Sequence, residues 1–119
     1  MSTILPYTAA ANIRIVIVSR HPAAIKFIAD NIGATCEPTL EVVGADGLKI
    51  HVLSEATIED VEGAIVYGNI PLSLASFAHA VFAVEFEGTP PRGAEYTLKD
   101  MVDAGAYLEV YQVSYGIKD

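Results

Sequence analysis

Hydrophobic and polar positions along the chain follow two patterns, one typical of buried strands and one typical of amphipathic helices. The first strand pattern is Asn12–Val18, a short, continuous and β-branched apolar run of the kind that is covered on both faces of a sheet. The segment Pro22–Ile32 predicts a helix, because proline suits the first turn and three isoleucines share one face. Gly33 can then provide a left-handed C-terminal cap. Together these residues predict a strand-turn-helix unit.

The next part of the chain has a weaker pattern. The stretch Gly33–Gly47 contains proline and several glycines around a short apolar run, Leu40–Val43, and is expected to be a loop with a possible extra strand. The segment Leu48–Leu53 then alternates apolar and polar side chains, which predicts a strand near an edge of the sheet.

The second half of the chain repeats the order of strand and helix. Ala64–Tyr67 predicts a buried strand, and Pro71 is expected to begin a helix whose Leu74 and Phe77 face inward. The other expected elements are a short acidic helix from Thr57 to Gly63 with Asp60 near its cap, a strand at Val81–Phe86, a loop at Glu87–Tyr96, a helix at Thr97–Ala104 with Asp100 near its cap, and a last strand at Ala106–Val113.

This alternation predicts a mostly parallel sheet with helices on both sides and right-handed crossovers. The chain has 119 residues, of which 52% are hydrophobic, so it can bury one core of useful size but not two. We therefore expect a single domain over residues 1–119 with a small, three-layer, Rossmann-like α/β fold.

Composition restricts the partners of this domain. Fifteen acidic residues against seven Lys and Arg give a net charge of -8, which opposes binding to duplex DNA because polyanion affinity depends on many cationic contacts. A small anion can still bind where one or two cations line a pocket. The N-terminal stretch lacks a signal-peptide pattern, and no apolar window reaches the roughly 18 residues of a membrane helix. We expect a soluble, cytoplasmic protein with no membrane partner.

Candidate chemistry lies in the loops that leave the strands, because open parallel sheets bind ligands outside the carboxyl ends of their strands. These loops are Ser19–His21, Gly68–Ile70 and Thr89–Gly93. The first two share a layout, in which a buried strand is followed by a short polar turn and then by proline. If their strands are neighbours, the two turns face each other across one crevice and can form an anion site with the free amides of the following helices.

Each of these residues also has a purely structural interpretation. Ser19 can cap the local backbone, and Arg20 can pair with a surface carboxylate. His21 can lie where it does because the proline after it disfavours helical geometry. Asn69 suits a turn or a helix N-cap, and Gly68 can relieve backbone crowding. The sequence leaves both interpretations open.

Several other chemistries are disfavoured. The chain lacks the glycine motifs of dinucleotide and phosphate loops, a nucleophile elbow and any clustered metal-ligand spacing, so we expect no NAD, no ATP hydrolysis, no serine triad and no metal. The lone Cys36 is expected to be a small buried or loop residue, and His51 and His79 to be surface residues. A last group of aromatic residues can stack on a base but is more typical of core or dimer contacts: Tyr107, Tyr111 and Tyr115.

Three segments carry a resemblance to a known family. They are VIVSRHPAAIKFI, VYGNIPLSLA and PPRGAEYTLKDMVDAGAYLEVYQV, which together cover well over half of the chain. In this order they resemble the small type III CRISPR-associated proteins of the Csx-sixteen kind. The S-R-H-P and G-N-I-P turns are the most specific part of the match.

The resemblance implies a ring nuclease that linearises cyclic oligoadenylates, chiefly cyclic tetra-adenylate, and so ends the antiviral signal. It implies a domain similar to the CARF-type domains that sense these rings, a homodimer, and catalysis without metal or cofactor by attack of the ribose 2′-hydroxyl. Ser19, Arg20 and His21 would then act on the scissile phosphate, and Gly68, Asn69 and Arg92 would bind the ligand. A module that sequesters the ring without cutting it, and a structural partner in a CRISPR complex, are the alternatives.

Overall fold

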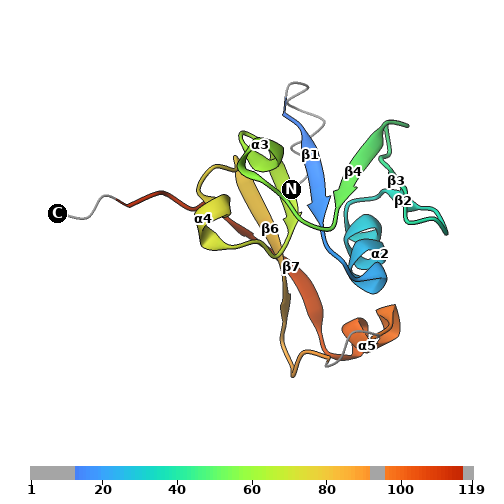
Figure 1. Cartoon of the computed structure of the whole chain (residues 1–119). Helices are drawn as coiled ribbons and strands as arrows, with labels where there is room; N and C mark the ends of the chain where they lie inside the picture. The colour runs from blue at the N-terminus through green and yellow to red at the C-terminus, as the bar shows by residue number, and fades with distance from the viewer. Residues whose placement is uncertain (1–12, 92–95, 117–119) are drawn as a thin grey trace.

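The computed structural model describes residues 13–91 and 96–116, and in them strands and helices follow one another largely as predicted (Figure 1). The strands are β1 (Ile15–Val18), β2 (Thr35–Cys36), β3 (Val42–Val43), β4 (Lys49–Leu53), β5 (Ile65–Gly68), β6 (Ala80–Phe86) and β7 (Ala106–Tyr111). The helices are α2 (Pro22–Asn31), α3 (Ile58–Val61), α4 (Leu72–Ala75) and α5 (Leu98–Asp103). No helix in these ranges is long and apolar enough to cross a membrane.

The strands form one mixed sheet in the order β2-β3-β4-β1-β5-β6-β7. The four central strands are parallel, whereas β2, β3 and β7 pair antiparallel with their neighbours. From β1 the chain reaches β4 on one side and then crosses to β5 on the other. The strand order therefore reverses at β1, which is the place where open α/β sheets bind ligands. This is an α/β fold compatible with a Rossmann-like arrangement.

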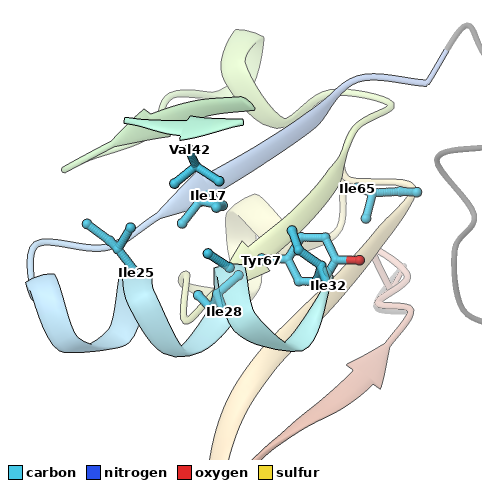
Figure 2. Packing of buried hydrophobic residues seen from close by; sticks show 8 residues of the cluster. Ile17, Ile25, Ile28, Ile32, Val42, Ile65 and Tyr67 are labelled. Atoms are coloured by element: carbon cyan, nitrogen blue, oxygen red, sulfur yellow. The ribbon is translucent and has the colours of Figure 1, made fainter. Parts of the chain in front are cut away.

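Side chains of β1 alternate between two apolar clusters, as the pleat of a strand requires. Ile17 is fully buried beside Ile28 of α2, and Figure 2 shows these residues with Val42 and Tyr67 in the same cluster. Val16 belongs to the second cluster, which includes side chains of α3 and α4. The continuous apolar run of β1 is explained by this burial of successive residues.

The predicted start of α2 is confirmed, and its end differs from the prediction by one residue. Pro22 occupies the first turn, where a missing N–H is tolerated, and the helix ends one residue before the predicted Ile32. Gly33 follows with a φ of 75°, and the N–H of Ala34 donates to the carbonyl of Ala29 at 2.8 Å. This is the hydrogen-bond pattern of a Schellman cap, which needs the left-handed glycine.

Both threonine caps are confirmed as complete capping boxes. At α3 the side chain of Thr57 accepts from the N–H of Asp60, and the Asp60 carboxylate accepts from the N–H of Thr57 at 2.8 Å. Thr97 and Asp100 make the same two bonds at the start of α5. The Thr57 N–H lowers the pKa of Asp60, because a hydrogen bond to a carboxylate favours its charged form.

The weakly patterned stretch after Gly33 forms a hairpin, β2–β3, rather than a loop with one extra strand. The N–H of Leu40 donates to the carbonyl of Glu37, and the N–H of Glu37 donates to the carbonyl of Glu41. Leu40 has a φ of 67°, the left-handed position that closes a three-residue hairpin loop. The hairpin continues the sheet beyond β4, so β4 is not its edge strand.

Two further expectations are wrong. The helix after Pro71 is a single turn, and Phe77 lies beyond it with 42% of its surface exposed instead of facing inward. The last strand ends at Tyr111, so Tyr115 is not part of it and is 82% exposed. The expected start of the first strand at Asn12 lies outside the described residues.

Candidate functional site

The turns that follow β1 and β5 line one cleft. These strands are parallel neighbours in a register that pairs Val18 with Gly68, so both turns leave the sheet at the same edge. Residues of Ser19–His21 and Gly68–Pro71 both line a cleft of about 600 Å³. The predicted proximity of the two turns is confirmed, whereas their role in function stays a prediction.

Gly68 permits the close approach of the two strands at this edge. Its φ is 136°, and a Cβ built at this position would overlap the carbonyl oxygen of Val18. Any other residue would push β5 away from β1. Gly68 therefore relieves backbone crowding, as one of the two interpretations of the sequence predicted.

Ser19 and His21 form the first polar turn. The Oγ of Ser19 accepts from the backbone N–H of His21 at 3.1 Å, and the N–H of Ser19 donates to the carbonyl of Leu53 on β4 at 2.9 Å. Ser19 thus holds the local backbone, as its structural interpretation requires, and its hydroxyl hydrogen can still donate to a ligand.

Arg20 pairs with Glu55, a residue that follows β4. The guanidinium donates to Glu55 Oε2 at 2.7 Å, and both side chains line the cleft while remaining mostly exposed, at 67% and 76%. The surface ion pair considered from the sequence is therefore present. A guanidinium has five N–H donors, and within the described residues this is the one hydrogen bond that it makes.

The ring of His21 lies against the ring of Tyr96 in the lining of the first cleft. The ring centroids are 5.0 Å apart and the planes are tilted by 35°. His21 occupies the N-cap position of α2 without capping it through its side chain, and within the described residues its ring nitrogens make no hydrogen bond. Tyr96 packs against the cluster of Phe27 and Met101, and partial burial raises the pKa of its phenol. The imidazole is therefore held through its ring face, with its nitrogens available.

Asn69 joins the second turn to β6. Its amide group donates to the carbonyl of Val84 at 3.3 Å and accepts from the N–H of Val84 at 2.9 Å. The last backbone pair between β5 and β6 is Tyr67 with Phe82, so Asn69 extends the ladder through its side chain. Asn69 is not the N-cap of α4, which is Pro71. Its amide fixes the position of Val84, which also lines the cleft.

The third predicted loop adds less to this site. Arg92 and Gly93 lie outside the described residues, and residues 89–91, the described part of this loop, do not line the cleft. The sequence did not identify Glu55 and Tyr96 as members of the site. Glu55 is 35 positions from Arg20 and Tyr96 is 75 positions from His21, so no local pattern could have connected them.

A second cleft of about 770 Å³ adjoins the first and shares three residues with it: Ser19, Arg20 and Ser54. Among the described residues, four of the eight Lys, Arg and His residues line one of the two clefts, compared with two of the thirteen Asp and Glu residues. The surroundings of the clefts are therefore less acidic than the rest of the chain, which favours an anionic ligand.

Other candidate groups lie away from this chemistry. Within residues 13–91 and 96–116, no group of three or more His, Cys, Asp or Glu side chains is placed to hold a metal ion. Burial raises the pKa of the half-buried Cys36 thiol, which disfavours a reactive thiolate. Tyr107 and Tyr111 share one face of β7 and are exposed, so neither is a core residue.

The fold and the first cleft define an α/β protein with polar residues lining a cleft at the carboxyl edge of its parallel strands. Comparisons add no relative, because no family model, no curated protein and no solved structure matches the chain.

Proposed function

We propose that the protein is a ring nuclease that linearises cyclic oligoadenylates, chiefly cyclic tetra-adenylate, and so switches off type III CRISPR antiviral signalling. We further propose a three-layer, Rossmann-like fold related to CARF-type domains, a cytoplasmic location and a homodimer. The observation that carries the proposal is the cleft at the strand reversal, where Ser19, Arg20 and His21 are in one turn opposite Gly68 and Asn69. These are the two turns that resemble the Csx-sixteen kind of protein.

The proposed reaction needs no metal ion. The ribose 2′-hydroxyl loses its proton as its oxygen forms a bond to the adjacent phosphorus, and the 5′-oxygen takes up a proton as its bond to phosphorus breaks, which leaves a 2′,3′-cyclic phosphate and a 5′-hydroxyl. Arg20 stabilises the extra negative charge on the phosphoryl oxygens, and His21 serves in proton transfer. Ser19 keeps these two residues in one tight turn through its bond to the N–H of His21.

Glu55 and Tyr96 support the two central residues. The Glu55 carboxylate orients the Arg20 guanidinium, and a phosphate that binds there uses donors that Glu55 leaves free. Tyr96 contacts the face of His21 and restricts its rotation while leaving its nitrogens able to exchange protons. Both residues thus act through the group that would touch the ligand.

A symmetric dimer suits the shape of the ligand. A ring of four identical nucleotides contains a twofold axis, and a twofold dimer presents the same turn twice around that axis. Each subunit would then contribute one Ser19–His21 turn to opposite sides of the ring.

The Arg20–Glu55 pair favours a second candidate function, a module that binds the ring without cutting it. A carboxylate beside the guanidinium reduces the positive charge that can stabilise the crowded phosphate of the transition state. Binding of the ground state requires less charge, so a sequestering module tolerates Glu55 better than an enzyme does.

The test is incubation of purified protein with cyclic tetra-adenylate in EDTA, followed by separation of intact and linear products. We expect linear products from the wild type and little or none from His21→Ala. An intact ring at stoichiometric protein would exclude the nuclease. If the ring is also tightly bound, with similar affinity in His21→Ala, the sequestering module is the correct function.

A further inference from the structure

The two clefts meet at the turn between β1 and α2. Ser19, Arg20 and Ser54 line both, so a ligand in the first cleft lies against the same residues as a ligand in the second. The second cleft is lined by α2 through Ile25, by the tip of the β2–β3 hairpin and by β4. Because the clefts are joined at their polar residues, one extended ligand can occupy both.

The size of the clefts agrees with such a ligand. Their volumes are about 600 Å³ and about 770 Å³, and each lies within the range of roughly 300–1,000 Å³ in which one small molecule is bound. A ligand that fills both therefore consists of more than one small-molecule unit. A chain or ring of linked nucleotides has this property.

The second cleft also has basic groups of its own. Lys49 and His51 line it, in addition to the shared Arg20. Lys49 pairs with Glu41 at 3.8 Å, with 73% of its side chain exposed, so the ammonium can reach an incoming anion without leaving a buried position. Glu41 is the carboxylate that lines this cleft, and it opposes the anion.

We infer that the second cleft is a second nucleotide subsite, in which Lys49 binds a phosphate of the same ligand that Arg20 holds between the two clefts. This inference rests on the proposed function, because it assigns a further part of the oligoadenylate to the protein. It makes the β2–β3 hairpin a part of the ligand site. It also predicts that removing the charge of Lys49 weakens ligand binding, whereas removing the charge of Glu41 strengthens it.

Isothermal titration calorimetry tests the inference with two probes: a 2′-fluoro analogue of cyclic tetra-adenylate, which has no nucleophilic hydroxyl, and adenosine monophosphate. We expect Lys49→Ala to weaken binding of the ring analogue by about threefold to fivefold, the upper range for one exposed charge pair. The monophosphate needs one subsite and can occupy either, so Lys49→Ala should weaken its binding less than that of the ring analogue. Glu41→Gln should strengthen binding of the ring analogue.

Lys99→Ala is the matched control. Lys99 is also exposed and also pairs with a carboxylate, Asp103 at 2.7 Å, but it lies on α5 outside both clefts. Equal affinity of Lys49→Ala and Lys99→Ala for the ring analogue would overturn the second subsite. Binding that responds to Lys49, together with an intact natural ring, would remove the nuclease activity and keep the subsite. A wild type that does not bind the ring analogue would contradict both.

Discussion

Gly68→Ala tests the physical basis of the candidate site, because Gly68 lies where the two polar turns come together. In the structure the added methyl group would meet the carbonyl oxygen of Val18, a backbone atom that no side-chain rotation can move away. The φ of 136° adds a second penalty, since residues with a Cβ rarely adopt it. The substitution can be accommodated only if β5 moves away from β1.

The size of the effect follows from these two causes. Forcing a non-glycine residue into such a conformation costs about 1–3 kcal/mol, and inserting a methyl group into a packed position costs about 1–3 kcal/mol more. We expect a total loss of about 2–6 kcal/mol in the free energy of unfolding. This is a large part of the ~5–15 kcal/mol by which a domain is stable.

Gly33→Ala is the control that separates the two causes. Gly33 has a φ of 75°, but a Cβ built on it meets no atom within 4 Å. Its substitution should therefore cost about 1–2 kcal/mol, the conformational penalty alone. Urea denaturation followed by circular dichroism measures both variants. Equal losses of stability in Gly68→Ala and Gly33→Ala would refute the close contact between Gly68 and Val18.

Three further predictions concern single groups. Arg20→Ala should reduce the rate of the proposed ring cleavage by about 10²–10³-fold. It should lower the free energy of unfolding by less than about 1 kcal/mol, because the ion pair of Arg20 is exposed. A large loss of stability in denaturant would contradict this prediction. Tyr96→Leu should change the ring-proton NMR shifts of His21, whereas Tyr96→Phe should preserve them, and identical spectra for both variants would exclude this contact between the two rings. The pKa of Asp60 is lowered in the folded chain, so the stability that its carboxylate provides is present above about pH 4 and lost as pH falls through the lowered pKa. Denaturation at several pH values should show the difference between wild type and Asp60→Ala narrowing in acid, and a constant difference would exclude this linkage.

Local patterns predicted the elements that position the first cleft. The continuous apolar run of β1 showed burial on both faces, and the proline and glycine around α2 marked its two ends. The same layout recurred at β5 and Pro71. These signals are contained within about ten residues each, so they can be read without knowledge of the rest of the fold.

Features that depend on contacts distant in the sequence could not be predicted in this way. The periodicity after Pro71 suggested a longer helix, but the chain turns after one helical turn, and the carbonyl of Phe77 accepts from the N–H of Gly63. β6 begins three residues after Phe77, and the side chain of Phe77 remains exposed. The Leu40 hairpin was missed because its left-handed position is filled by leucine, whereas glycine would have indicated it.

The same limit applies to the site. The sequence placed Ser19, Arg20, His21 and Asn69 in two turns, but their partners come from other strands and loops. Asn69 was expected to act in a turn or at a helix cap, and it instead bridges to β6 because β5 ends before its neighbour does. Neighbouring strands are known only once the sheet order is known.

The sheet order also explains how an acidic chain can carry a site for an anionic ligand. At physiological salt, exposed charges separated by more than about 8–10 Å are largely screened, so the net charge of -8 matters less than the groups within one turn of the ligand. The clefts beside β4, β1 and β5 are lined by half of the described Lys, Arg and His residues and by two of the thirteen described Asp and Glu residues. The two carboxylates there, Glu41 and Glu55, each pair with a cation of the site. Each carboxylate therefore orients its cation, and an anion must compete with the carboxylate to bind that cation. A ligand with several phosphates contacts several cations at once, so it competes better than free phosphate does.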